Sequence, residues 1–418
     1  MITRRELVYG SGLFALSSMF STMAYLIRSS TTPILRGIYS PQQSTSEMKE
    51  LASDLNLEIY INETFNIVQV SGFQGTEEFK NNTKLELTST TRGPNYTKTQ
   101  SIDSTNTNNH TPPPQPPENT DTDTDIFTDK EYWDQFTTVQ NESNGASNVR
   151  TGIIDGNYNT EQYNVHSSHS TINTQIPFNA FSKIHDSVSE HGKKTSNTLF
   201  HQNPTISHKN NIMRGFAHNA DKYHFMLDYE GSTNSISFIE GLTWILHQEI
   251  DVLGIALAPS EDPVLQHVFT EFLKRSNCIT IIGAGNGDIC DTNSYNYLTK
   301  IDSSKVIRVG AYSTRHQKAL GSTETADIIT LSDIHILNTL QYSGTSSAGT
   351  IVTGLASQYL GILKQQYSHI SDNKQKEIVK SSILSSNTTI EYSHCDIPTP
   401  LLEPENGLQT LHELATQQ

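Results

Sequence analysis

The chain has 418 residues, of which 34% are apolar, so a sizeable folded core must share the chain with polar linker. The formal net charge is −16, and an acidic surface repels phosphate groups, which argues against nucleic-acid binding. The cysteines are Cys278, Cys290 and Cys395, and an odd number is not typical of a disulfide framework.

Residues 1–32 have the pattern of an export signal. Arg4 and Arg5 precede a run from Leu7 to Ile27 that contains no charged residue. A pair of arginines ahead of an apolar stretch is typical of the twin-arginine export route. The run is also long enough to cross a bilayer, so retention as an N-terminal membrane anchor is the alternative. Both interpretations predict a location outside the cell or on the outer face of its membrane.

Residues 33–85 predict a small α+β unit. Residues 46–55 place apolar side chains on one face of a helix, with Ser46 as the expected N-cap. The apolar runs at 57–61 and 67–70 are predicted strands.

Residues 86–128 are of low complexity and include the segment TPPPQPPENTDTDTD. A segment with so little apolar surface cannot offset its ordering entropy, so we expect a disordered or extended linker. Such a linker is also where proteolytic nicking is easiest.

From residue 129 to the end, short apolar runs alternate with longer amphipathic ones. The runs RTGIID, DVLGIALA, CITIIGAG and KVIRVGA are the predicted strands of this region. Strands that alternate with helices favour a mostly parallel sheet covered by helices on both faces. The sequence therefore predicts an α/β domain spanning 129–418.

Four polar residues stand where such a fold could use them chemically. Asp155 and Asn286 each follow an apolar strand, and His191 lies in the first turn of a predicted helix. Ser346 begins a run of small residues that continues as an apolar helix. Sites in α/β folds form at the carboxyl ends of parallel strands, and a helix N-terminus stabilises developing negative charge. Taken singly, each residue also has a structural explanation, such as a turn aspartate or a capped core helix.

Two other kinds of site are not supported by the sequence. Gly283 and Gly285 form a G-x-G, but the dinucleotide-binding fingerprint needs a third glycine where the chain has Asp288, which disfavours a nucleotide-dependent oxidoreductase. His166 and His169 have no carboxylate or thiol partner at a spacing useful for binding a metal.

Together the four segments resemble the motifs of the subtilisin-like serine peptidases (subtilases, peptidase family S8). These segments are GIIDGN, HGKKTSN, GAGN and GTSSAGTIVTG, and the resemblance covers roughly residues 129–418. It implies a catalytic triad of Asp155, His191 and Ser346, with Asn286 as a donor to the oxyanion.

The same resemblance implies a subtilisin-like three-layer sandwich, preceded by a prodomain-like unit. It implies a substrate groove lined by two strand ends. The predicted groove residues are Ile255, Ala256, Leu257, Ala258, Gly283, Ala284 and Gly285. The expected partners are polypeptide substrates, cleaved after a medium-sized apolar side chain, and the chain's own prodomain-like segment. No cofactor is predicted with certainty, and a structural calcium ion is left open.

The chain departs from the family pattern beside the motifs. Thr350 stands where the family usually has proline, and Gly156 stands where serine or threonine is usual. Lys193 and Lys194 stand where threonine and histidine are usual. The sequence therefore predicts an exported serine endopeptidase, and the alternative is a catalytically impaired binding or scaffold protein on the same fold.

Overall fold

The computed structural model describes residues 33–72, 74–92, 96–99, 129–156, 165–169, 190–204, 206–208, 211–227, 232–258, 262–286, 298, 301, 304–313, 318–320, 326–336, 340–390 and 399–418. The predicted signal or anchor at 1–32 and most of the predicted linker lie outside these residues. Every helix within them is too short or too polar to cross a membrane.

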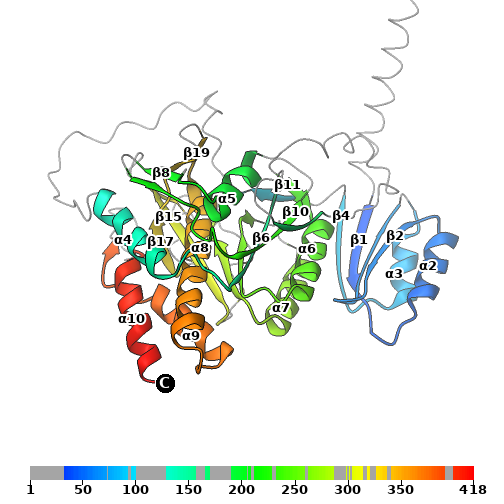
Figure 1. Ribbon diagram of the computed structural model, residues 1–418. Helices are drawn as coiled ribbons and strands as arrows, with labels where there is room; N and C mark the ends of the chain where they lie inside the picture. The colour runs from blue at the N-terminus through cyan, green and yellow to red at the C-terminus, as the bar shows by residue number, and fades with distance from the viewer. Residues whose placement is uncertain are drawn as a thin grey trace, which may run out of the picture.

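The N-terminal unit is a four-stranded antiparallel sheet with two helices packed against it (Figure 1). Its strands run in the order β2-β3-β1-β4. The elements are β1 (Pro33–Ile38), α2 (Thr45–Asp54), β2 (Glu58–Asn62), β3 (Ile67–Ser71), α3 (Thr76–Thr83) and β4 (Leu87–Arg92). The N-cap of α2 is Ser44, not Ser46, because the Ser44 hydroxyl accepts the N–H of Glu47.

The folded unit extends beyond the predicted boundary at residue 85. β4 pairs with β1 along its whole length, from Leu87 opposite Ile38 to Arg92 opposite Pro33. The segment LTSTTR contains one apolar residue, so it looked like linker in the sequence. Its β-branched threonines and its backbone groups are nevertheless suited to an edge strand.

The large domain is built on an eight-stranded sheet in the order β16-β15-β14-β12-β6-β10-β7, with β17 also paired to β15. All its pairings are parallel except that of β16 with β15. The strands are β6 (Arg150–Gly156), β7 (His166–His169), β10 (Asp221–Leu227), β12 (Val252–Ile255), β14 (Ile279–Gly283), β15 (Val306–Ser313), β16 (Lys318–Leu320) and β17 (Ile328–Leu331).

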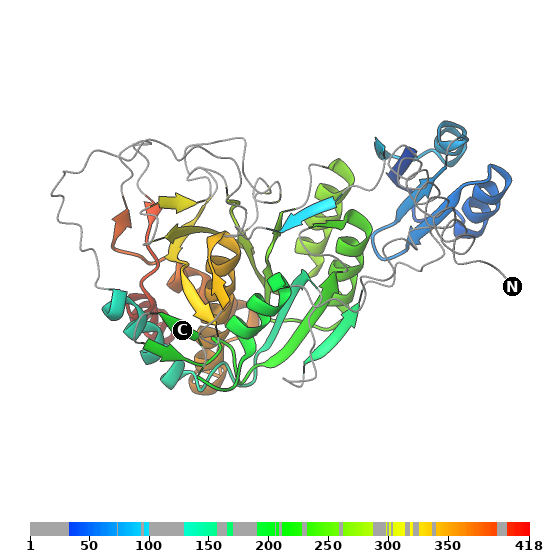
Figure 2. The same ribbon diagram turned by 90° about the horizontal axis from the view of Figure 1, so that it is seen from above.

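Helices cover both faces of this sheet (Figures 1 and 2). They are α4 (Asp129–Glu142), α5 (Glu190–Phe200), α6 (Ser235–His247), α7 (Pro263–Arg275), α8 (Gly344–Gln366), α9 (Asp372–Ile383) and α10 (Pro404–Thr416). Shorter strands are β8 (Ile206–His208), β9 (Asn211–Met213), β18 (Ile334–Ile336), β19 (Leu340–Tyr342), β20 (Thr389–Ile390) and β21 (Thr399–Pro400).

Successive residues of the central strands enter two different hydrophobic cores. Ile153 of β6 and Ile281 of β14 belong to the core beneath α4, α8, α9 and α10. Their neighbours Ile154 and Ile282 belong to the core beneath α6 and α7. This alternation is what a strand buried on both faces requires. The predicted three-layer α/β fold is therefore confirmed.

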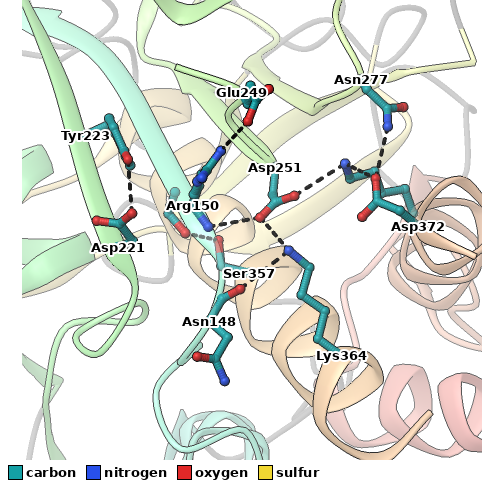
Figure 3. A network of polar contacts seen from close by, with 12 residues as sticks. Asn148, Arg150, Asp221, Tyr223, Glu249, Asp251, Asn277, Ser357, Lys364 and Asp372 are labelled. Atoms are coloured by element: carbon teal, nitrogen blue, oxygen red, sulfur yellow. Dashed lines mark hydrogen bonds and ion pairs between the residues drawn. The ribbon is translucent and has the colours of Figure 1, made fainter. Parts of the chain in front are cut away.

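A polar network fastens the amino edge of the sheet (Figure 3). Asp251, just before β12, accepts the backbone N–H of Arg150 at 3.0 Å. The same carboxylate contacts the ammonium groups of Lys364 in α8 at 2.6 Å and Lys376 in α9 at 3.3 Å. One carboxylate thus joins two strand starts to two helices, at the edge opposite the carboxyl ends of the strands.

The N-terminal unit packs against α7 and its neighbour α6 (Figure 1). Ile38, Phe65 and Ile67 join the hydrophobic core formed by these two helices. Across the contact, the Arg36 guanidinium donates to the carboxylate of Asp262, and both side chains are buried. Asp262 is also the N-cap of α7, where it accepts the N–H of Val264 at 3.0 Å.

Candidate active site

Asp155 and His191 form a buried pair at the carboxyl edge of the sheet. Asp155 is the penultimate residue of β6, and His191 lies in the first turn of α5. His191 Nδ1 lies 2.7 Å from Asp155 Oδ1, which also accepts the N–H of Gly156 at 2.6 Å. The carboxylate fixes the orientation of the imidazole and leaves Nε2 as its outward nitrogen.

The Asp155 carboxyl group is held in its charged form. Burial alone raises its pKa, but the charge of His191 and hydrogen bonds from His191, Thr195 and the Gly156 N–H outweigh that effect. The pKa of Asp155 therefore lies below its ordinary value.

Ser346 lies in the first turn of α8, at the positive end of a 23-residue helix. Gly344, which starts this helix, has a φ of +83°, a left-handed conformation that favours glycine. In the described part of the chain, Ser346 Oγ and His191 Nε2 are both buried without a hydrogen-bond partner. α5, which carries His191, packs against α8, which carries Ser346.

Asn286 follows β14 and is tied to the start of α8. Its side-chain oxygen accepts the backbone N–H of Thr345 at 2.9 Å and the Thr345 hydroxyl at 3.0 Å. With the oxygen used in this way, the side-chain NH₂ group is left as the donor. Thr345, the residue before Ser346, therefore orients the Asn286 amide and holds it close to the start of α8.

A three-stranded antiparallel sheet lies over the predicted groove. Its order is β11-β5-β13, comprising β5 (Tyr96–Thr99), β11 (Ser232–Asn234) and β13 (Leu257–Ala258). Thr99 pairs with Leu257 and Lys98 with Ala258, while Ser232 pairs with Lys98 from the other side. Figure 2 shows β5 as the light-blue arrow lying over the large domain, apart from the blue N-terminal sheet. The middle strand thus precedes the large domain in the sequence.

The predicted groove residues form two segments, one at the end of β12 and one at the end of β14. The side chains of Ile255 and Leu257 belong to the hydrophobic core, so these residues can contribute only backbone groups. Ala256 is also buried. Gly285 has a φ of +115° between β14 and Asn286, which again favours glycine. Gly283 and Ala284 lie directly before it, and the Ala284 N–H bonds to Val309 of β15.

Strand β5 and a set of hydroxyl groups near His191 were not predicted from the sequence. Thr195 lies four residues, or one helical turn, after His191, and Thr350 lies four residues after Ser346. Tyr342, the last residue of β19, lies four residues before Ser346. The spacing of four residues from His191 or Ser346 is the sequence signal that could have indicated these three hydroxyl residues. Among the described residues, no group of three or more His, Cys, Asp or Glu is placed to hold a metal ion. The calcium ion left open above stays a prediction.

Comparison with known proteins connects this geometry to characterised relatives. No family model matches the chain. Subtilisin E of Bacillus subtilis (strain 168) is 27% identical over 229 residues, which are 51% of this chain and 56% of that protein. Subtilisin NAT of Bacillus subtilis subsp. natto matches to the same extent. The chain spans about half the length of the curated relatives it matches.

Solved structures show the same fold at lower identity. The epidermin leader peptide processing serine protease EpiP of Staphylococcus aureus has a TM-score of 0.61 and 13% identity, covering 91% of this chain and 98% of that one. Fervidolysin of Fervidobacterium pennivorans, a keratinolytic enzyme, has a TM-score of 0.58 and 13% identity, covering 91% of this chain and 61% of that one.

Proposed function

We propose that the chain is a subtilisin-like serine endopeptidase acting on polypeptides, because it is similar in sequence to two subtilisins and shares the fold of EpiP and fervidolysin. The observation that carries this proposal is the buried Asp155–His191 pair: its Nε2 atom has no hydrogen-bond partner among the described residues, and its helix packs against α8, which carries Ser346 in its first turn.

In the proposed reaction, Ser346 Oγ attacks the carbonyl carbon of the scissile bond, and His191 Nε2 takes the hydroxyl proton. Asp155 stabilises the imidazolium that forms. The Asn286 amide and the Ser346 backbone N–H bind the oxyanion. His191 then gives its proton to the leaving amine, which departs and leaves an acyl-enzyme. Water, deprotonated by the same imidazole, hydrolyses the ester and restores the serine.

We propose that residues 33–99 inhibit the enzyme until it is processed. β5 pairs with both β11 and β13, which is how an extended peptide would add a strand in the groove. The N-terminal unit is held against α6 and α7 by a hydrophobic contact and by the Arg36–Asp262 pair. Processing is expected between residues 100 and 128, where the linker follows β5.

The N-terminal segment supports export by the twin-arginine route, with retention as a membrane anchor as the alternative. The preference for a medium-sized apolar residue before the cleaved bond is also a proposal. A peptide library assayed with the processed protein would test that preference directly.

The experiment that tests the function is labelling of the purified full chain with a fluorophosphonate, comparing wild type with Ser346→Ala. Labelling of the wild type that disappears in Ser346→Ala supports an activated serine. Absence of wild-type labelling at low and high salt, and after an added protease has cut within 100–128, would favour the impaired binding or scaffold protein instead.

A further inference from the structure

We infer that Tyr342 is a positioning residue that sets the distance between His191 and Ser346. The inference rests on the proposed function and identifies a component of the active site that the family motifs do not include. The feature behind it is a buried hydroxyl contact between the helix that carries the base and the helix that carries the nucleophile.

Tyr342 lies behind the imidazole of His191. The two rings are edge-on, with centroids 5.8 Å apart and an interplanar angle of 84°. The tyrosine side chain is buried, and its hydroxyl lies 2.8 Å from Thr195 Oγ1. Thr195 stands one turn after His191 in α5, and its hydroxyl lies 3.1 Å from the His191 carbonyl oxygen. Tyr342 thus contacts both the ring of His191 and the helical turn that holds it.

The same hydroxyl reaches the helix of the nucleophile. Thr350 Oγ1 lies 3.4 Å from Tyr342 Oη and donates to the Ser346 carbonyl oxygen at 2.7 Å. Thr350 stands one turn after Ser346, as Thr195 does after His191. A proline at position 350 would have no hydroxyl, so this half of the contact depends on the departure noted in the sequence.

The number of hydroxyl protons determines which group donates in the contacts among Tyr342, Thr195 and Thr350. Each threonine hydroxyl has one proton, which Thr350 gives to the Ser346 carbonyl and Thr195 gives to the His191 carbonyl or the nearby Asp155 carboxylate. Both threonine oxygens therefore remain as acceptors. Burial, together with the charge of Asp155, raises the pKa of Tyr342, so its phenol keeps its proton and donates to the nearer oxygen, that of Thr195.

The geometry matters because α5 and α8 are joined only through tertiary contacts. Proton transfer from Ser346 to His191 needs heavy atoms within about 3 Å, and a misplacement of about 1 Å costs roughly 10² in rate. Removing the Tyr342 hydroxyl would take away the hydrogen bond that it donates to Thr195. The starts of α5 and α8 could then move apart.

The test is Tyr342→Phe, which keeps the ring and removes the hydroxyl, in the full chain after processing. With active sites titrated by the fluorophosphonate, we expect kcat to fall about tenfold while KM stays within about twofold. The matched control is Tyr359→Phe. Tyr359 is a buried tyrosine in the second half of α8, and its hydroxyl donates to the Pro404 carbonyl oxygen, just before α10. This control should lower the melting temperature similarly and leave kcat within about twofold.

Thr195→Val provides a second variant should Tyr342→Phe fail to fold, and the same fall in kcat is expected. In the double variant Tyr342→Phe/Thr195→Val, the effects on kcat should be less than additive, because each substitution removes the same Tyr342–Thr195 hydrogen bond. Equal kcat values for Tyr342→Phe and Tyr359→Phe, or fully additive effects of Tyr342→Phe and Thr195→Val, would overturn the inference alone. Failure of the wild type to label would instead overturn the proposed function, and the inference with it.

Discussion

The Arg36–Asp262 pair allows a prediction of how tightly the N-terminal unit binds the large domain. The side chains of Arg36 and Asp262 are 3% and 1% exposed, and Gln69 also accepts from Arg36 Nε at 2.6 Å. Replacing Arg36 by methionine fills similar space but leaves the buried Asp262 carboxylate without its cationic partner, although it still accepts the Val264 N–H. Removing one member of a buried ion pair costs about 3–5 kcal/mol. Because the Val264 hydrogen bond remains, we expect Arg36→Met to weaken binding of the N-terminal fragment by about 3–4 kcal/mol, or roughly 10²–10³ in affinity.

The assay uses the full chain carrying Ser346→Ala, cut between residues 100 and 128 by an added protease. The dissociation constant of the released N-terminal fragment is then compared with and without Arg36→Met. Arg275→Met is the interface control, because Arg275 makes an exposed contact with the Thr64 carbonyl and the Phe65 ring and should cost less than about tenfold. Adding Asp262→Asn, which keeps the N-cap, should recover most of the affinity lost with Arg36→Met. A loss below threefold for Arg36→Met would refute this reasoning.

Three further predictions concern the site and the network beneath it. Asn286→Ala should lower kcat by roughly 10²–10³ with little change in KM, and unchanged turnover would remove Asn286 from the oxyanion site. Asp251→Ala should lower the free energy of unfolding by about 2–3 kcal/mol, because Lys364 and Lys376 lose their shared carboxylate, and chemical denaturation of the Ser346→Ala background measures this. The interactions that lower the pKa of Asp155 are fully present above its ordinary value of 3.8 and are lost as the pH falls through the lower folded value. Thermal melts between pH 2 and 6 should therefore show a smaller acid-induced loss of stability for Asp155→Asn than for the wild type.

The sequence predicted those features that depend on local pattern. The period and length of the apolar runs indicated a sheet buried on both faces, because residues such as Ile153 and Ile154 must enter opposite cores. Strand ends and helix starts also marked Asp155, His191, Asn286 and Ser346 as candidates; the structure pairs Asp155 with His191 and joins Asn286 to the residue before Ser346, and their catalytic roles stay a prediction.

The remaining features are contacts between distant segments that have no local pattern. Arg36 and Asp262 are 226 residues apart, and nothing near either residue indicates the other. β4 and β5 pair mainly through backbone groups, which every residue except proline can offer, so their polar sequences looked like linker. The Tyr342–Thr195 contact joins residues 147 apart, and a threonine within a helix has many structural explanations.

The strand β5 has a consequence for the proposed processing of the chain. Its pairing with β11 and β13 is a ladder of main-chain groups, and the segment YTKT repeats threonine at alternate positions. In a ladder of this kind, a slip by two residues keeps every side chain on the same face, so the register is only weakly fixed. If cleavage follows the register of β5, we expect ragged amino termini spaced by two residues, and a mass spectrum of the processed protein would resolve them. A single sharp terminus would mean that side-chain pockets, rather than the backbone ladder, select the cleaved bond.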